Sequence, residues 1–477
     1  MAKYRIESDT MGTVRVPAGA RYGAQTARAA ANFRISGYRF PRGFIRALGL
    51  VKAAAARMNL GYGLLDRRIA AAIERAAREV AEGKWDGEFV LDVFQTGSGT
   101  STNMNANEVI ANRANELLGR KKGPEIEPND TVNKCQSSND VIPTAIHLAA
   151  LSALDHDLVP ALDGLARGLE KKAREFKGVV KTGRTHLQDA VPVTLGQEFS
   201  GWATQVRKGI GRIRTARTSL LEIPIGGTAL GTGLNAPAGF GSRMSVELAR
   251  TTGLPVRPAR NRFEAIGARD ALVEASGALK TVAVSLIKIA SDIRLLASGP
   301  RAGIGEIILP ELQPGSSIMP GKVNPVIPEV VIQVGAQVIG NDAAVTVGGM
   351  LGQLELNAMM PLIARNILES AALLAGSVRA FNDLCVAGGP RMPGNPANAR
   401  GISANRNRCR ELLEKGLMPV TALAPKLGYR EAARIAKEAA RTGKTVREIV
   451  LGKKLLAAKD LDRLLDFNAL TRPGIRR

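Results

Sequence analysis

Apolar residues recur along most of the chain at the three- and four-residue spacing of α-helices, whereas the alternating pattern of strands is scarce. The clearest stretch runs from about Arg269 to Ser298, where large and small residues alternate at the two core positions of a heptad. The large residues are Leu272, Leu279, Leu286 and Ile293, and the small ones are Ser276, Ala283, Ala290 and Ala297. Further helical patterns cover about Leu195–Leu221 and about Asp140–Glu175. These patterns predict a core of long helices. At about 1.5 Å per residue, the helix over Arg269–Ser298 would be too long for one compact neighbour to cover, which favours an oligomer.

The segment Gly388–Pro396 has the sequence GGPRMPGNP, and this density of glycine and proline predicts a break between domains. Beyond it, from about Ala397 to Arg477, short basic helical patterns alternate with glycine-rich turns. Both a helix-turn-helix nucleic-acid binder and a small helical cap domain fit that pattern.

The composition of the 477 residues, with 45% hydrophobic and 23% charged side chains, excludes a disordered or collagen-like chain. Lys and Arg outnumber Asp and Glu by 66 to 43, a formal charge of +23. Three interpretations of this charge stay open: a solvated basic surface, a nucleic-acid binder, and a cleft that concentrates a small anionic substrate. An aromatic content of 4% leaves few platforms for stacking on bases, which weakens the second.

The three cysteines, Cys135, Cys385 and Cys409, are too few for a disulfide framework and too widely spaced for a zinc or iron–sulfur site. A charge or an amide interrupts every strongly apolar stretch before the roughly 20 residues that a membrane span needs. Lys288 and Asp292 are examples, and the first residues contain no apolar signal core. We therefore expect a cytoplasmic protein without a membrane segment.

Four polar islands interrupt the helical patterns. The first, Thr96–Asn103, is rich in hydroxyls and glycines, which form helices poorly and suit a loop that surrounds an anion. The second, Gln136–Asp140, precedes Pro143 and predicts a helix start with Ser138 or Asn139 as the N-cap. The free amides of a helix N-terminus can bind a carboxylate, although each island alone also fits a plain turn or cap.

The third island, Gly183–Asp189, contains His186 between hydroxyl, amide and carboxylate side chains in a predicted loop. An imidazole in such surroundings can move protons near neutral pH. The other two histidines, His147 and His156, lie within helical patterns, and we expect them to have structural or surface roles.

The fourth island, Gly315–Pro325, combines glycines and prolines with two serines, Lys322 and Asn324, and is predicted to be a loop. A serine acts as a base only if positive charge and amide donors stabilise its deprotonated hydroxyl. Lys322 supplies that charge.

Together the islands resemble the signature segments of the class II fumarase/aspartase superfamily. The longest match is GSSIMPGKVNP at Gly315–Pro325. The others are SGTSTNMNANEVIANRA from Ser98, NKCQSSND from Asn133 and GRTHLQDA from Gly183. The likeness covers nearly the whole chain, so chance does not explain it.

The resemblance implies a mainly α, three-domain fold. An N-terminal lyase domain would cover 1–138, a central bundle of long helices 139–390, and a small helical domain 391–477. In this superfamily the bundle forms the core of a homotetramer, and each active site gathers loops from different subunits. The resemblance also implies a small dicarboxylate substrate, fumarate or L-malate, with no cofactor, no metal, no nucleic acid and no membrane as partner.

By the same resemblance, Ser316 is the base that removes a proton beside a carboxylate, and Lys322 stabilises the resulting aci-carboxylate. His186 would handle the departing or attacking water, and Glu329 would be the carboxylate that orients it. The residues expected to contact the substrate are Ser98, Gly99, Thr100, Ser137, Ser138, Asn139, Thr185, Ser317, Val323 and Asn324.

Two activities of the superfamily compete for this chain. Gly227, Ser138 and the segment Arg269–Lys280 look like fumarases, because aspartases tend to place alanine at the first position and threonine at the second. Val326–Val331 and Gly352–Asn357 look closer to aspartases. We expect a fumarate hydratase, with aspartate ammonia-lyase as the alternative.

One segment departs from the family pattern. Fumarases carry His-Pro-Asn-Asp at a second, non-catalytic dicarboxylate site, where this chain has Glu127, Pro128, Asn129 and Asp130. A glutamate is an anion at neutral pH and repels a dicarboxylate, which puts this second site in doubt. The remaining alternative, a catalytically silent structural or nucleic-acid-binding relative, conflicts with the intact Ser316, His186 and Lys322 of the islands.

Overall fold

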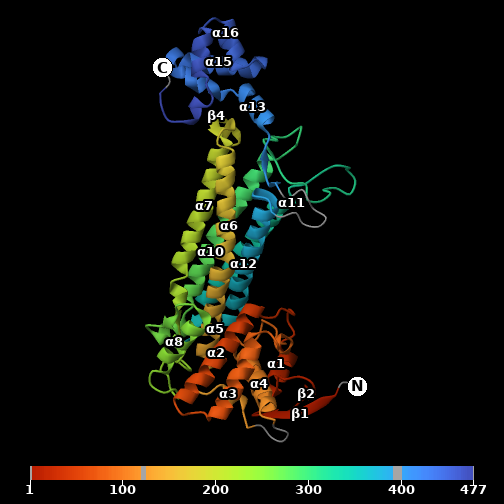
Figure 1. Ribbon diagram of the computed structural model, residues 1–477, viewed down its shortest axis with the longest axis vertical. Helices are drawn as coiled ribbons and strands as arrows, with labels where there is room; N and C mark the ends of the chain where they lie inside the picture. The colour runs from red at the N-terminus through yellow and green to blue at the C-terminus, as the bar shows by residue number, and fades with distance from the viewer. Residues whose placement is uncertain (1–2, 120–124, 390–399, 476–477) are drawn as a thin grey trace. The chain divides into compact units, whose positions relative to one another are not determined.

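The computed structural model describes residues 3–119, 125–389 and 400–475 (Figure 1). The chain divides into two compact units, each described here by itself. Unit 1 comprises Met1–Pro160, Gly209–Ala283 and Val334–Ala375, and unit 2 comprises Ala161–Lys208, Val284–Gln333 and Gly376–Arg477. Five helices contribute residues to both units: α6 (Val159–Glu175), α7 (Leu195–Ala216), α10 (Asp270–Leu296), α11 (Val326–Met350) and α12 (Met360–Phe381).

Unit 1 is built mainly from helices, with three small two-stranded sheets. Its other α-helices are α1 (Ala24–Asn32), α2 (Arg42–Gly61), α3 (Arg67–Ala81), α4 (Thr100–Leu117), α5 (Ser138–Ser152), α8 (Phe240–Thr252) and α9 (Arg262–Gly267). Short 3₁₀ turns occur at Asp86–Glu88 and Ser219–Leu221, and π-helical turns at Pro128–Val132 and Ala153–Leu158. The antiparallel strand pairs are β1 (Tyr4–Asp9) with β2 (Gly12–Pro17) and β8 (Gly352–Gln353) with β9 (Leu356–Asn357), and β5 (Glu222–Ile223) pairs in parallel with β6 (Arg257–Pro258).

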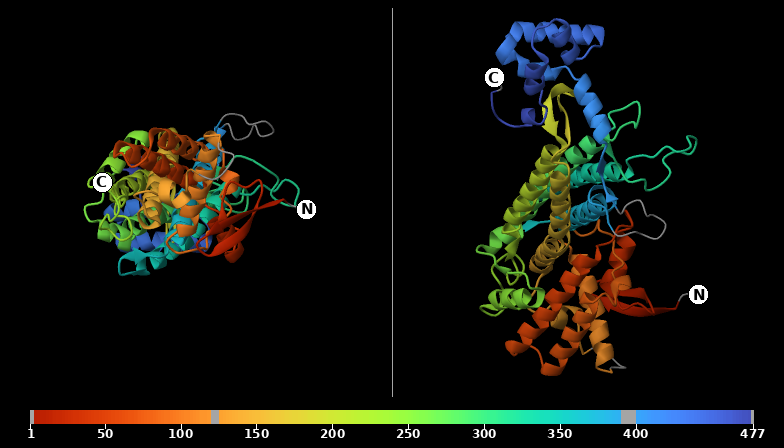
Figure 2. Two further views of the ribbon diagram at one scale, coloured as in Figure 1. Left: turned by 90° about the horizontal axis from the view of Figure 1, so that it is seen from below. Right: turned by 45° about the horizontal axis from the view of Figure 1, so that its top comes forward.

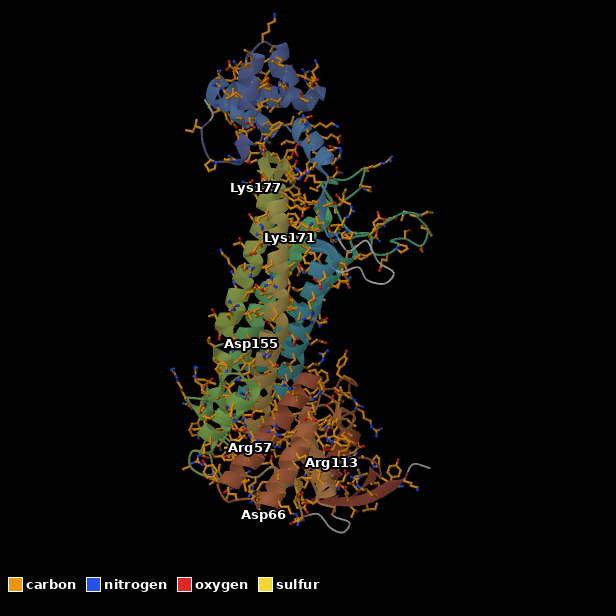
Figure 3. The ribbon with its side chains drawn as sticks, viewed as in Figure 1. Arg57, Asp66, Arg113, Asp155, Lys171 and Lys177 are labelled. Atoms are coloured by element: carbon orange, nitrogen blue, oxygen red, sulfur yellow. The ribbon has the colours of Figure 1, made fainter. Side chains whose placement is uncertain are left out.

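Within unit 1, helix α2 packs against α3 and α5, and α3 also contacts α4. Leu48 on α2, Ile73 on α3 and Ile110 on α4 are fully buried. Asp66, labelled in Figure 3, starts α3 because its carboxylate accepts the N–H groups of the first helical turn. Arg113 of α4, also labelled, donates to Glu79 of α3 at 2.7 Å and joins the two helices.

Unit 2 contains the β3 (Val180–Thr185) and β4 (Gln188–Thr194) hairpin and a group of short C-terminal helices. These are α13 (Arg406–Lys415), α14 (Ala424–Leu427), α15 (Tyr429–Thr442), α16 (Val446–Gly452) and α17 (Ala458–Leu464). Strand β7 (Ile307–Ile308) pairs with β10 (Ser403–Ala404), a π-helical turn covers Asn382–Val386, and 3₁₀ turns cover Met418–Leu423 and Ala469–Thr471. The C-terminal helices share an apolar core that includes the fully buried Leu423, Ile435 and Val450.

Within unit 2 the long helices run side by side (Figure 1). Arg207 of α7 donates to Glu170 of α6 at 2.8 Å, and the indole of Trp202 on α7 donates to Asp292 of α10 at 3.1 Å. The hairpin packs against the C-terminal helices, as Figure 2 shows. This hairpin carries one of the predicted site segments.

The three predicted long helices are confirmed as α10, as α7, and as α5 and α6 joined by the π-helical turn at Ala153–Leu158. The large heptad residues of α10 are at most 1% exposed in the chain itself. The chain's own helices therefore cover this seam, so the seam is not evidence for a second subunit.

Helix α11 is long and apolar enough, by length and composition, to cross a membrane, and it is the one such helix among the described residues. Only 33% of its most apolar stretch is buried, and Glu329, Asn341 and Asp342 interrupt it. The same length and composition occur in core helices of soluble proteins.

The predicted division at 138/139 and 390/391 stays a prediction. The second boundary and most of the glycine- and proline-rich segment around it lie outside the described residues.

Candidate active site

Hydroxyl groups from the first two islands meet in unit 1. The Thr100 Oγ1 atom lies 2.7 Å from Ser98 Oγ and 2.7 Å from Ser138 Oγ. Asn139, beside Ser138, donates its side-chain N–H to the Ala229 carbonyl at 2.8 Å. The structure thus brings together residues that are about 40 positions apart in the sequence.

Two helices begin at this hydroxyl cluster, α4 at Thr100 and α5 at Ser138. The first residues of a helix have free N–H groups and the positive end of the helix dipole, so two such ends attract a carboxylate. The prediction that all of Thr96–Asn103 is a loop is wrong for its second half, which is the first turn of α4. Gly99, with φ 72°, is the N-cap and ends the loop there.

The N-cap of α5 is Ser137, one residue before the positions we predicted. Its hydroxyl accepts the N–H of Asn139 at 3.2 Å, and Asp140 reaches back to the N–H of Ser137 at 3.0 Å. This capping box leaves the side chain of Ser138 free to face Thr100. Pro143 lies within the helix, as predicted.

The third island is a β-hairpin in unit 2, and the predicted loop is confined to its two-residue turn, which contains His186. Thr185 ends β3, and His186 and Leu187 form its two-residue turn with φ values of 56° and 61°. Both residues are exposed, so the imidazole at the tip is open to solvent. The turn needs left-handed backbone at both positions, which is costly without glycine.

Charged side chains anchor strand β3 of this hairpin. Arg184 donates to both carboxylate oxygens of Glu306, at 2.9 and 3.0 Å, and the buried Lys181 ammonium lies 3.1 Å from Glu306 and 2.8 Å from Glu198. Glu306 is fully buried. A bidentate Arg–carboxylate pair has a fixed geometry, so this cluster orients the strand that ends at Thr185.

The fourth island is a loop, as predicted, and its backbone surrounds the Ser316 hydroxyl. Ser316 Oγ accepts the N–H groups of Met319 at 2.9 Å and Ile318 at 3.2 Å. Two amide donors on one oxygen favour its deprotonated form. The loop closes through Gly315, whose N–H donates to the Lys322 carbonyl at 2.7 Å.

Lys322, Asn324 and Glu329 line a cavity of about 650 Å³ in unit 2 together with Arg294. Glu329 forms a 3.8 Å ion pair with Arg294 of α10. The Asn324 amide donates to the Gly315 carbonyl at 2.6 Å and so holds the serine loop. Ser317 and Val323 are exposed, and Val323 also lines this cavity.

The predicted site residues fall into two sets, one in each unit. Ser98, Gly99, Thr100 and Ser137–Asn139 belong to unit 1, whereas the hairpin and serine-loop residues belong to unit 2. Even within unit 2, no hydrogen bond joins His186 to Ser316 or to Glu329 among the described residues.

Three residues near the site were missed by sequence reasoning. Arg294 lines the serine-loop cavity, Lys52 donates to Asn133, and Asp140 accepts the N–H of Gly226. Lys52 and Arg294 are ordinary positions within helices, and only contacts between distant segments reveal them. The single signal was Asp140, which follows Ser137 at capping-box spacing.

The doubtful second site lies at the start of a π-helical turn in unit 1. Glu127 is its exposed N-cap, and the Glu127 N–H donates to Thr131 Oγ1 at 2.6 Å. Its carboxylate makes no ion pair with another described residue. Pro128, Asn129 and Asp130 form the first turn beside it.

Among the described residues, no group of three or more His, Cys, Asp or Glu side chains could hold a metal ion. The three cysteines are buried and free, and burial raises the pKa of Cys385 and of Cys409 to about 12. The expectation that no cofactor is needed stays a prediction.

A family model described as "Lyase" matches residues 12–340, and one described as "Fumarase C C-terminus" matches residues 420–472. The fold and these matches define a lyase of the fumarase/aspartase superfamily with a mainly α architecture.

Similar curated proteins are named fumarate hydratase class II. The protein from Nitrosomonas europaea is 52% identical over 473 residues, covering 99% of this chain and all of that protein. The one from Mycobacterium tuberculosis is 54% identical over 476 residues, covering 99% and 97%. The chain belongs to the class II fumarate hydratase family.

Solved structures similar to this chain support the same family assignment. Recombinant class II fumarase from Schistosoma mansoni has a TM-score of 0.93 at 38% identity, over 99% of this chain and all of that one. A fumarate lyase:delta crystallin from Brucella melitensis, in a crystal with cobalt, has a TM-score of 0.92 at 46% identity over the same shares.

Proposed function

We propose that the chain catalyses the reversible anti addition of water to fumarate, giving L-malate. The observation that carries this proposal is the meeting of Thr100 and Ser138 at two helix N-termini, a site suited to a carboxylate. The relatives named above, which align over the full chain, support the same activity.

Ser316 is proposed as the base in the malate direction. It would remove a proton from the carbon next to a carboxylate and leave an aci-carboxylate dianion. So weak a carbon acid demands preorganised donors for the developing charge. The N–H groups of Ile318 and Met319 would stabilise the alkoxide, and Lys322 would bind the carboxylate that takes up charge.

His186 and Glu329 are proposed to handle the departing water. A carboxylate that accepts from an imidazole fixes its tautomer and raises its basicity. In one chain Glu329 faces Arg294 instead. We therefore assign the His186–Glu329 pairing to residues of different subunits.

A homotetramer with shared active sites is the proposed assembly. Helix α11 supports it, because Val330 is 42%, Val347 51% and Met350 75% exposed on a helix whose apolar stretch is mostly unburied. Such a surface marks a protein interface. The cytoplasmic location stays a prediction.

The space around Gly227 bears on the alternative activity, aspartate ammonia-lyase. A Cβ atom there would lie 2.7 Å from Ile266 Cδ1 and 3.1 Å from the Pro224 carbonyl oxygen. The alanine typical of aspartases would displace the flexible end of the Ile266 side chain and press slightly on the Pro224 carbonyl, contacts that the fumarase-like glycine avoids.

The deciding experiment supplies L-malate and L-aspartate separately and follows fumarate by its ultraviolet absorbance. We expect much faster fumarate formation from malate. Faster ammonia release from aspartate would overturn the proposal, and no turnover of either combined with tight, salt-sensitive DNA binding would indicate a silent relative.

A further inference from the structure

A buried lysine donates hydrogen bonds to the segment that leads into Ser138, and it has no role in the chemistry proposed above. Lys52 of α2 is 0% exposed, and its ammonium donates to Asn133 Oδ1 and to Gln136 Oε1, each at 3.0 Å. It forms no ion pair with a described residue. An ammonium without a salt-bridge partner is costly to bury, so its retention calls for an explanation.

Asn133 is the centre of the contacts that Lys52 makes. Its side-chain oxygen also accepts from Asn103 and Asn107 of α4, each at 3.2 Å. Its side-chain N–H donates to the Gln136 carbonyl at 3.2 Å. These bonds hold residues 133–136 against α2 and α4, including Cys135, whose φ of 61° is unfavourable for a residue other than glycine.

Asp140 fixes the other end of the same segment. It is 0% exposed, and besides the Ser137 N–H it accepts the N–H groups of Gly226 and Thr228, each at 2.9 Å. Thr228 has a φ of 53°, another left-handed position that needs support. Asp140 thereby ties the start of α5 to the turn at 226–229.

We infer that Lys52 and Asp140 are positioning residues, which together hold residues 133–140 so that Ser138 and Asn139 face the substrate carboxylate. The inference rests on the proposed function, since it assigns that carboxylate to the hydroxyl cluster. Neither residue touches the cluster directly. Lys52 acts through Asn133 and Gln136, and Asp140 acts through backbone amides.

The two buried charges also depend on each other. Burial raises the pKa of Asp140 to about 6, and the backbone amides and the field of Lys52 oppose this rise. Burial lowers the pKa of Lys52 to about 7, which the field of Asp140 opposes. The Gly226–Thr228 turn contributes only backbone donors, and the groups from α4 are uncharged amides. Removing the Lys52 charge therefore raises the pKa of Asp140 further.

A positioning role and a merely structural role predict different kinetics. Contacts that bind the carboxylate equally in the ground and transition states change KM and leave kcat alone. A variant that only folds less well has fewer active molecules, which lowers the apparent kcat and leaves KM unchanged.

The test compares Lys52→Met and Asp140→Asn with the wild-type enzyme, using malate as substrate. We expect KM to rise at least about 10-fold while kcat changes less than about 3-fold, and Lys52→Arg to restore part of the KM. In Lys52→Met the acid limb of the kcat/KM profile should move to higher pH, because Asp140 then stays protonated to higher pH.

Glu108→Gln is the matched control. Glu108 is a buried carboxylate of unit 1 that accepts three backbone N–H groups, from Gly23, Gln25 and Thr26 at 2.8 to 3.1 Å. The Glu108→Gln substitution should leave KM unchanged. If Lys52→Met does not fold, Gln136→Met removes one of the two acceptors of Lys52 and keeps the ammonium, and a raised KM is again expected.

Unchanged KM in the folded variants, or a KM change as large in Glu108→Gln, would overturn the inference. A wild-type enzyme that does not convert malate would overturn the proposed function instead, so the two failures are distinguishable.

Discussion

At the scale of single residues, the proposed chemistry depends on one serine hydroxyl that accepts two backbone N–H groups. Ser316 is half-buried, and its acceptor bonds come from the next turn of its own loop. The loop thus carries its own stabilising donors, and Lys322 adds a positive charge. A serine in an ordinary loop would not be acidic enough to act as a base.

Ser316→Ala and Lys322→Met should each lower kcat at least about 10²-fold, because removal of one strong transition-state stabiliser costs about 2.7–4 kcal/mol. The steady-state rate with malate measures this, and sedimentation confirms that the oligomer is intact. Near-normal turnover of Ser316→Ala would place the base elsewhere, with Ser317 as the first residue to test.

Glu127 carries a second prediction. As an exposed anion it should exclude a second dicarboxylate, so one malate should bind per active site at neutral pH. Glu127→His should permit weak extra binding, measured by calorimetry, with little change in kcat. Electron density for malate beside Glu127 in a wild-type crystal at neutral pH would contradict this explanation.

At the scale of elements, the β3–β4 hairpin is held mainly by the buried carboxylate of Glu306. Glu306→Gln would leave Arg184 without its bidentate partner and Lys181 with Glu198 alone. Breaking a buried pair costs about 3–5 kcal/mol. We expect faster hydrogen exchange in both strands and a lower kcat through misplacement of His186.

Glu411→Gln is the control for this change, because Glu411 pairs with Arg408 and Lys415 on an exposed face of α13. It should alter neither exchange nor rate. Equal effects of the two substitutions would show that the hairpin does not depend on Glu306.

The long helices were predictable because their signal is local and repeated. The heptad pattern of α10 repeats four times, and the observed helix, Asp270–Leu296, differs from the predicted range by one residue at the start and two at the end. The β3–β4 hairpin was missed because its turn contains His186 and Leu187 where glycine or asparagine is typical.

The site could be predicted only in part. Each island could be recognised in the sequence by its glycines, prolines and hydroxyl side chains. The resemblance to the fumarase/aspartase superfamily then assigned roles to the island residues. Nothing local indicates that Thr100 and Ser138 touch, that Arg294 faces Glu329, or that Lys52 supports Asn133. Those pairings arise from packing between segments far apart in the sequence.

At the scale of the whole molecule, the formal charge of +23 should assist capture of a dianionic substrate. We expect kcat/KM for malate to fall as ionic strength rises from about 0.01 M to about 0.15 M, since the Debye length shortens from about 30 Å to about 8 Å. Rates in neutral viscogens provide the control. A flat response would mean that the charge only solvates the surface.

The division of the site residues between two parts of the chain has a genetic consequence. If each site takes its hydroxyl cluster from one subunit and its serine loop from another, two inactive alleles can compensate for one another. Co-expressed Thr100→Val and Ser316→Ala chains should then regain activity that neither has alone, because some mixed oligomers contain a site with both halves intact. Separately purified variants mixed without exchange of subunits should stay inactive. In a cell that carries two alleles of such a gene, the activity of a variant chain therefore depends on the other chain with which it assembles.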